Sequence, residues 1–185
     1  MVLFYLTLAA ELALGAALTL SIVSPVRRIW PTPGWQSWQF WFVWVLIVLV
    51  LASLGVLALS NWNSFLFPGG LRYFVGLPLF LGGLVLAFSG VGRLGAYNSA
   101  GLKGELRTGG VYRYSRNPQY LGDATMLVGL ILFSNASLVI LPGLLGALLF
   151  ALWPFTEEPW LTEPFGSDYE RYCERVPRFF SFREI

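Results

Sequence analysis

The sequence contains no histidine and only one cysteine, Cys173. A single cysteine cannot form a disulfide within the chain, and it cannot build a thiolate zinc site. The absence of histidine removes the commonest metal ligand and the commonest acid–base side chain at neutral pH. We therefore expect no bound metal, and a chemistry carried by carboxylates, arginines and tyrosines.

Charged residues are also scarce. They make up 12% of the 185 residues while apolar residues make up 56%, whereas soluble domains carry about 25% charged residues. This composition predicts an integral membrane protein with a single domain over residues 1–185. We expect its partners to be membrane lipids and a lipid or prenylated small-molecule substrate, and no nucleic acid.

Five apolar stretches divide the chain. Residues 3–23, 39–60 and 71–91 are long enough to cross a ~30 Å hydrocarbon layer as helices. Residues 120–133 and 138–153 are shorter, and the turn between them predicts a helical hairpin that barely spans or packs against its neighbours. We therefore expect an all-α bundle of five transmembrane helices, with a three-span part at 1–92 and a loop, hairpin and cap at 93–185.

A short cytoplasmic amphipathic helix is expected after the hairpin. Ser167 and Glu170 have the spacing of a capping box, which marks a helix start. Its apolar stripe would consist of Tyr169, Tyr172, Cys173 and Val176. Such a helix lies on the membrane surface or caps the bundle.

Several residues of the apolar part are predicted to serve packing or anchoring. Glu11 lies within the first span, where we favour a hydrogen bond to a neighbouring helix over a functional role. Trp30, Trp35 and Trp38 are typical of the membrane interface. Small residues on one face of the third span favour close helix packing. They are Gly76, Gly82, Gly83, Ala87 and Gly90.

The basic residues predict an orientation. With five crossings, only Arg72 falls on one side of the membrane, and the positive-inside rule makes the other side cytoplasmic. This places the N-terminus outside and the candidate active site on the cytoplasmic face. The basic side carries Arg27, Arg28, Arg93, Lys103, Arg107, Arg113, Arg116, Arg171, Arg175, Arg178 and Arg183.

Residues 104–122 form the most polar stretch between the apolar ones. Arginines and tyrosines alternate in it, and the acidic pair Glu157–Glu158 follows the hairpin on the same side of the membrane. Together they suit a ligand with an anionic end, hydroxyl groups and a flat ring. On composition alone we would favour a lipid-phosphate or positive-inside role for the arginines, and the acidic pair could be a solvated helix end.

Four motifs occur in a fixed order in the second half. They read G-G-V-Y-R-Y-S-R-N-P-Q-Y-L-G at 109–122, E-E-P-W-L at 157–161, F-G-S-D-Y-E-R-Y at 165–172 and V-P-R-F at 176–179. This order resembles the isoprenylcysteine carboxyl methyltransferase and phospholipid methyltransferase superfamily of integral membrane enzymes. Gly90-Val91-Gly92 is also similar to a G-x-G motif of the phospholipid branch.

The resemblance implies S-adenosyl-L-methionine as the methyl donor. It implies a cofactor site formed by Gly90, Gly92, Tyr112, Arg113, Arg116, Pro118, Tyr120, Glu157 and Glu158, with Arg116, Asn117 and Glu157 as candidate catalytic residues. Two positions depart from the family pattern, because Asn117 and Gly104 stand where the family often has histidine. Asparagine can exchange hydrogen bonds but cannot act as a base.

The missing base bears on the methyl acceptor. A carboxylate needs no deprotonation, whereas an amine with a pKa near ~10 does. We therefore favour carboxyl methylation of an isoprenylcysteine-type acceptor over N-methylation of a phospholipid such as phosphatidylethanolamine. A nicotinamide-dependent membrane reductase and a non-enzymatic scaffold are the remaining alternatives.

Overall fold

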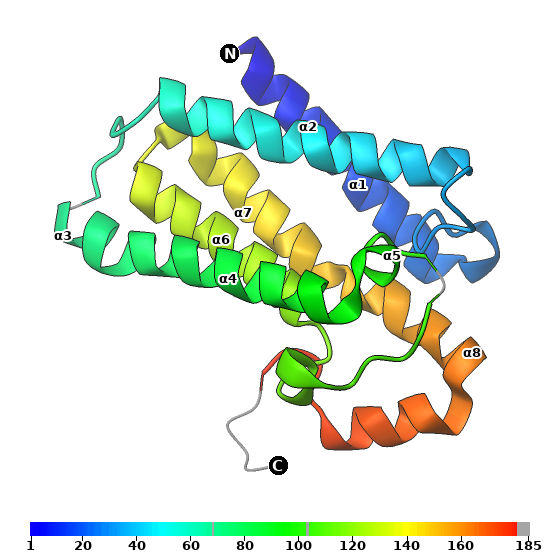
Figure 1. Ribbon diagram of the computed structural model, residues 1–185. Helices are drawn as coiled ribbons and strands as arrows, with labels where there is room; N and C mark the ends of the chain where they lie inside the picture. Colours follow the sequence, from blue (N-terminus) through cyan, green and yellow to red (C-terminus); the bar gives the residue numbers. More distant parts are fainter. Residues whose placement is uncertain (68, 103, 181–185) are drawn as a thin grey trace.

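The computed structural model describes residues 1–67, 69–102 and 104–180, which form helices and loops without a strand (Figure 1). Lys103 and Arg183, counted above for the orientation, lie outside these ranges. A π-helical stretch, Arg72–Gly76, joins α3 to α4, and 3₁₀ turns lie at Pro25–Arg27 and Gly110–Arg113. The helices are α1 (Val2–Val23), α2 (Trp38–Ser60), α3 (Gly69–Leu71), α4 (Leu77–Leu94), α5 (Ala96–Ser99), α6 (Pro118–Ser134), α7 (Ser137–Leu152) and α8 (Pro154–Arg175).

Four continuous helices in the described ranges are long and apolar enough to cross a membrane. They are Val2–Val23, Trp38–Ser60, Gly69–Leu94 and Ser137–Arg175. The apolar part of the last one is α7, since α8 is polar. With 17 residues α6 is shorter, yet it lies between α4 and α7 (Figure 1). The all-helical membrane bundle is thus confirmed, while the fifth crossing stays a prediction.

Helices α4 and α6 pack so closely that glycine is required at the contact. A Cβ on Gly83 would lie 2.4 Å from the backbone nitrogen of Met126. The expected face of small residues is confirmed for Gly76, Gly83, Ala87 and Gly90, which are buried in the bundle. It is wrong for Gly82, because nothing lies within 4 Å of a Cβ built there.

The turn between α6 and α7 is fastened to the loop after α2. Asn135 adopts the left-handed conformation with φ 50°, which asparagine tolerates. Its Nδ2 donates to Asn63 Oδ1 and to the Phe65 carbonyl oxygen, each at 2.8 Å. Arg72 Nε donates to the Phe133 carbonyl oxygen at 3.1 Å. The hairpin therefore reaches the end of the bundle where α2 ends and α4 begins.

Glu11 lies buried at the middle of α1, with 0% of its surface exposed. Neither of its carboxyl oxygens has a hydrogen-bond partner in the described part of the chain. The expected hydrogen bond to a neighbouring helix is therefore wrong. The residue of α7 that faces the Glu11 carboxyl is Gly146, which has no side chain to donate a hydrogen bond. A Cβ built on Gly146 would lie 3.2 Å from Glu11 Oε1.

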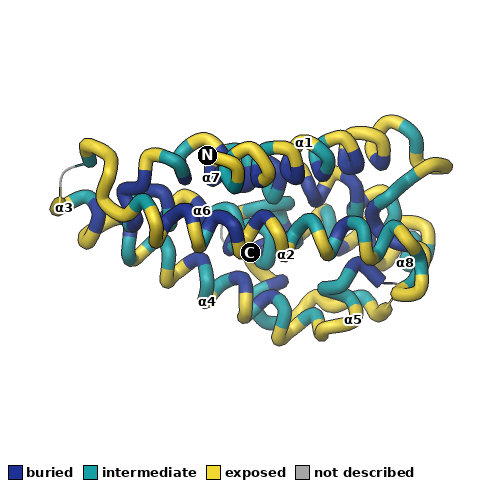
Figure 2. Tube along the Cα trace, turned by 90° about the horizontal axis from the view of Figure 1, so that it is seen from above, coloured by how far each residue is buried: buried dark blue, intermediate teal, exposed yellow. Residues whose placement is uncertain are grey.

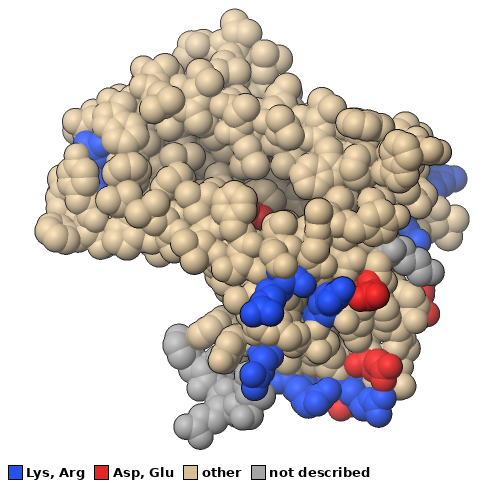
Figure 3. Space-filling model, viewed as in Figure 1, with Lys and Arg blue, Asp and Glu red and all other residues tan. Residues whose placement is uncertain are grey.

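The two ends of the bundle differ in polarity. Buried positions follow the inner sides of the helices, while the outer sides carry exposed residues, many of them apolar (Figure 2). Most charged side chains visible in Figure 3 gather at the end that carries α8. There α8 bends at Gly166, with φ +47°, so that its last turns fold back on the loop before α6. The polar chemistry is thus concentrated at one end.

Candidate active site

A cavity opens at this charged end, between the loop after α4, the start of α6 and α8. It is lined by residues from all three of these segments. Its lining includes Asn98, Tyr112, Arg116, Asn117, Tyr120, Glu157 and Trp160. The central polar stretch and the acidic pair, separated by the hairpin in sequence, therefore meet in space.

Glu157 stands in the first turn of α8, beyond the apolar helix α7. Its Oε1 accepts hydrogen bonds from Trp30 Nε1 at 2.6 Å and from the Tyr120 hydroxyl. Burial raises the pKa of the Glu157 carboxyl to about 7, against the lowering effect of these two donors and with a smaller rise from Glu158. Near neutral pH, Glu157 is therefore divided between its acid and its carboxylate.

Trp30 is not the interface residue that the sequence predicts. It is 2% exposed and packs edge-on against Trp44 and Trp153, with ring centroids 6.5 Å and 5.7 Å away. The reason for the difference is Glu157, which gives the indole N–H a partner in the interior. Trp35 and Trp38 are exposed, and their position at the interface stays a prediction.

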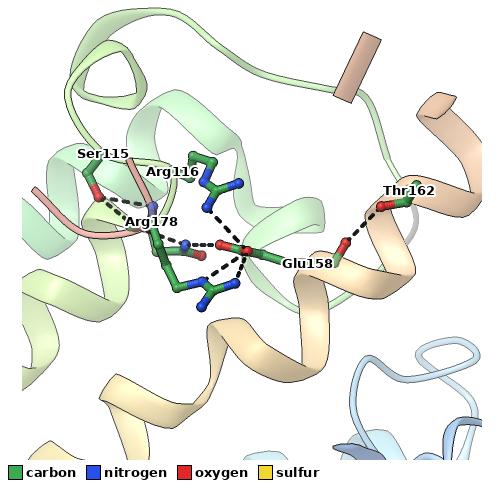
Figure 4. A network of polar contacts seen from close by, with 6 residues as sticks. Ser115, Arg116, Glu158, Thr162 and Arg178 are labelled. Carbon is green, nitrogen blue, oxygen red and sulfur yellow. Dashed lines mark hydrogen bonds and ion pairs between the residues drawn. The ribbon is translucent and has the colours of Figure 1, made fainter. Parts of the chain in front are cut away.

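Glu158 joins the loop before α6 to the chain after α8 (Figure 4). Its Oε2 accepts from Arg178 Nε at 3.0 Å and Nη2 at 2.8 Å, with Arg116 Nη2 at 3.5 Å. Its Oε1 accepts from Asn117 Nδ2 at 3.0 Å. We call these four residues the carboxylate clamp. The side chains of Glu158 and Arg116 are 9% and 13% exposed, so this pair is shielded from water and screening salt, whereas the Arg178 side chain is 35% exposed.

Arg116 belongs to the clamp and also lines the cavity. Its backbone N–H donates to the Pro177 carbonyl oxygen at 3.0 Å, which fixes the loop. Its Nε is buried without a hydrogen-bond partner among the described residues. An unpaired buried donor is costly, and Arg116 brings a guanidinium group to the cavity wall.

Two tyrosines tie the cavity wall to α8. The Tyr172 hydroxyl donates to the backbone oxygen of Tyr112 at 2.7 Å. Burial raises the pKa of both tyrosines above its usual range, so both stay neutral at physiological pH. Tyr169, Tyr172 and Val176, three of the four residues of the predicted apolar stripe, are buried together and pack against Leu106. The end of α8 therefore covers the cavity loop.

The predicted site residues fall into two groups. Tyr112, Arg116, Asn117, Tyr120 and Glu157 line the cavity. The others lie outside it: Glu158 in the clamp, Pro118 buried at the start of α6, Gly90 against Gln119, and Gly92 and Arg113 in a separate surface groove. The ligand contacts of both groups stay predictions.

Three residues at the site were not among the predicted site residues. Arg178 and Trp160 stand inside the motifs V-P-R-F at 176–179 and E-E-P-W-L at 157–161, so these motifs were the available signal. Arg178 belongs to the clamp, and Trp160 lines the cavity from α8. Asn98 lines the cavity from α5, outside the four motifs, so only the fold brings it to the site.

Comparison with known proteins identifies the family. The model of the phospholipid methyltransferase family matches residues 71–168, just over half of the chain. A protein-S-isoprenylcysteine O-methyltransferase of Schizosaccharomyces pombe is 35% identical over an alignment of 80 residues that covers 39% of this chain and 31% of that protein. The match thus covers less than a third of that relative, and no solved structure matches this chain. The chain belongs to the phospholipid methyltransferase family.

Proposed function

We propose that this protein uses S-adenosylmethionine to methylate the carboxylate of an isoprenylcysteine-type acceptor. The observation that carries the proposal is the cavity, which combines the guanidinium of Arg116, the carboxyl of Glu157 and several aromatic rings. The name of the yeast relative supports a carboxylate acceptor. Such an acceptor needs no base, which suits a chain without histidine.

The lining fits the proposed donor. When bound, S-adenosylmethionine supplies an electrophilic methyl group on a sulfonium. Arg116 would pair with the methionyl carboxylate, and Glu157 would accept from the ribose hydroxyls or the amino group. The rings of Tyr112, Tyr120 and Trp160 would contact the adenine and the sulfonium.

The remaining predicted residues would shape this site. Asn117 stands in the family's histidine position, and its Nδ2 already donates to Glu158 and to the Arg178 carbonyl oxygen. It would therefore hold the loop and align the acceptor instead of moving a proton. We assign Gly90, Gly92, Arg113, Pro118 and Glu158 to the support of the loop and of the helix ends around it.

N-methylation of a phospholipid is the second candidate. The observation in its favour is the pKa of about 7 for Glu157, because a carboxylate with that pKa can accept a proton from an ammonium group near neutral pH. The family model that matches residues 71–168 points in the same direction.

An assay with purified protein and labelled methyl donor separates the two candidates. A farnesylated cysteine analogue and phosphatidylethanolamine are offered in parallel vesicle reactions. We expect label on the cysteine analogue, with ester chemistry that base hydrolysis releases. Labelled phosphatidylethanolamine with an inert cysteine analogue would reverse the order of the two proposals.

Two substitutions test the donor site. Arg116→Ala and Glu157→Ala should each weaken S-adenosylmethionine binding by about 1.5–3 kcal/mol, the range for hydrogen bonds to charged groups. Isothermal titration calorimetry measures the change, and Arg175→Ala, an exposed residue of α8 outside the cavity lining, is the matched control. Unchanged affinity in both cavity variants would place the donor elsewhere.

We also propose five membrane crossings in one domain over residues 1–185, with α6 as the fourth. At ~1.5 Å per residue, its 17 residues span about 26 Å, close to a ~30 Å hydrocarbon layer. The ties of Asn135 to the loop after α2 support a hairpin that runs the full length of the bundle. The N-terminus would then lie outside, and the last turns of α8 would form the cytoplasmic amphipathic helix.

Reporter fusions test this topology. A fusion after Asn61 should report the outer side, and a fusion after Ile185, which lies outside the described residues, should report the cytoplasm. The physical reason is the concentration of basic residues at one end of the bundle (Figure 3). Equal reports from the two sites would contradict an odd number of crossings between Asn61 and Ile185.

A further inference from the structure

We propose that Trp30 is a positioning residue, which orients Glu157 toward the bound methyl donor. Trp30 lies between α1 and α2, outside the segment 71–168 that the family model matches. The inference rests on the proposed function, because it assumes that Glu157 contacts the donor.

Both hydrogen bonds to Glu157 end on the same oxygen. Trp30 Nε1 donates to Oε1 at 2.6 Å, and the Tyr120 hydroxyl donates to Oε1 as well. Two donors from different directions fix the plane of the carboxyl group. Oε2 has no hydrogen-bond partner in the described part of the chain, and Glu157 lines the cavity. The arrangement leaves one oxygen for a ligand.

Trp30 is fixed by contacts of its backbone and of its ring. The backbone N–H donates to Ser21 Oγ at 3.1 Å, and the indole ring packs against Trp44 and Trp153. On the cavity side it touches Gly101, where a Cβ would lie 2.3 Å from the ring. Gly101 has φ +73° and lines the cavity. Trp30 therefore contacts α1, α2 and the cavity wall at the same time, so the packing of α1 and α2 determines where it lies at the wall.

The charge state of Glu157 depends on its neighbours. The titratable groups that face it are Tyr120 from α6, Tyr112 from the 3₁₀ turn and Glu158 beside it. Trp30 does not titrate, and its N–H stabilises the carboxylate. Loss of that donor raises the pKa of Glu157. When the pH is lowered, Glu157 then becomes protonated at a higher pH than in the wild type, and binding that needs the carboxylate is lost at that higher pH.

The test is the pH dependence of S-adenosylmethionine binding in Trp30→Phe, which keeps a ring and removes the N–H. We expect about tenfold weaker binding at pH 7 and a midpoint about one pH unit higher. Trp35→Phe, an exposed residue of the same connector, is the matched control. In a Glu157→Ala background, Trp30→Phe should have little further effect, because the acceptor of the indole N–H is gone.

A second measurement does not require the variant to fold. In ¹⁵N-labelled wild-type protein, one indole N–H resonance should titrate with the midpoint of binding and move when S-adenosylmethionine is added. Glu157→Gln should abolish its titration. Failure of the wild type to bind S-adenosylmethionine would reject the proposed function. A wild type that binds, with an unaltered pH profile in Trp30→Phe or with no titrating indole resonance, would reject the role of Trp30 alone.

Discussion

Gly83→Ala should lower the free energy of unfolding by about 3 kcal/mol or more, at the upper end of the cost of overpacking. The added Cβ would lie 2.4 Å from Met126 N and 2.7 Å from the Gly122 carbonyl oxygen. Both are backbone atoms of α6, so no side-chain rotation relieves the contact. The two helices must move apart, which also removes van der Waals contacts along their interface.

The neighbouring glycine supplies the control. Gly82→Ala adds the same methyl group in the same helix, but nothing lies within 4 Å of it. Since alanine favours a helix over glycine by about 1 kcal/mol, this variant should be as stable as the wild type or slightly more so. Thermal unfolding in detergent, followed by circular dichroism, compares the two variants. Equal losses in both would show that α4 and α6 do not pack as described.

Glu158→Ala should destabilise the cavity end by about 3–5 kcal/mol, the cost of removing one partner from a buried ion pair. Arg116 and Arg178 would lose the carboxylate that they share, and Asn117 would lose an acceptor. The loop before α6 is then no longer held against the chain after α8. We expect a lower unfolding temperature together with loss of methyl donor binding.

Two further variants separate charge from packing. Glu158→Gln keeps the shape and one acceptor, so it should be less damaging than Glu158→Ala. Glu163→Ala removes an exposed carboxylate of the same helix, 3.7 Å from Arg28, and should change stability by less than about 1 kcal/mol. A Glu158→Ala protein as stable as Glu163→Ala would mean that the clamp contributes nothing to the fold.

The helices could be predicted because an apolar run is itself the signal for a membrane helix. Residues 3–23 and 39–60 correspond to helices Val2–Val23 and Trp38–Ser60. Gly82 and Gly83 show where this signal ends, since only the rotation of α4 against α6 decides which glycine is in the contact. Composition also indicated that Glu11 would be buried, but not that its oxygens would lack a partner.

The site was predictable where one motif carries it. Arg116, Asn117 and Tyr120 stand close together in the sequence, and the structure brings all three to the cavity. Trp30 was not predictable, because its partner Glu157 is 127 positions away. A tryptophan near a membrane edge has the same local sequence whether it faces lipid or a buried carboxylate. Such long-range pairs come from the fold and leave no local pattern.

The carboxylate clamp constrains the order in which parts of the protein fold during synthesis. A chain is made from its N-terminus, and its parts fold as they become available. Asn117 donates to the carbonyl oxygen of Arg178, 61 residues further on. Helices α1, α2, α4, α6 and α7 are therefore all synthesised before this contact of the cavity wall can form. Synthesis of these apolar helices and closure of the cavity wall are separate events.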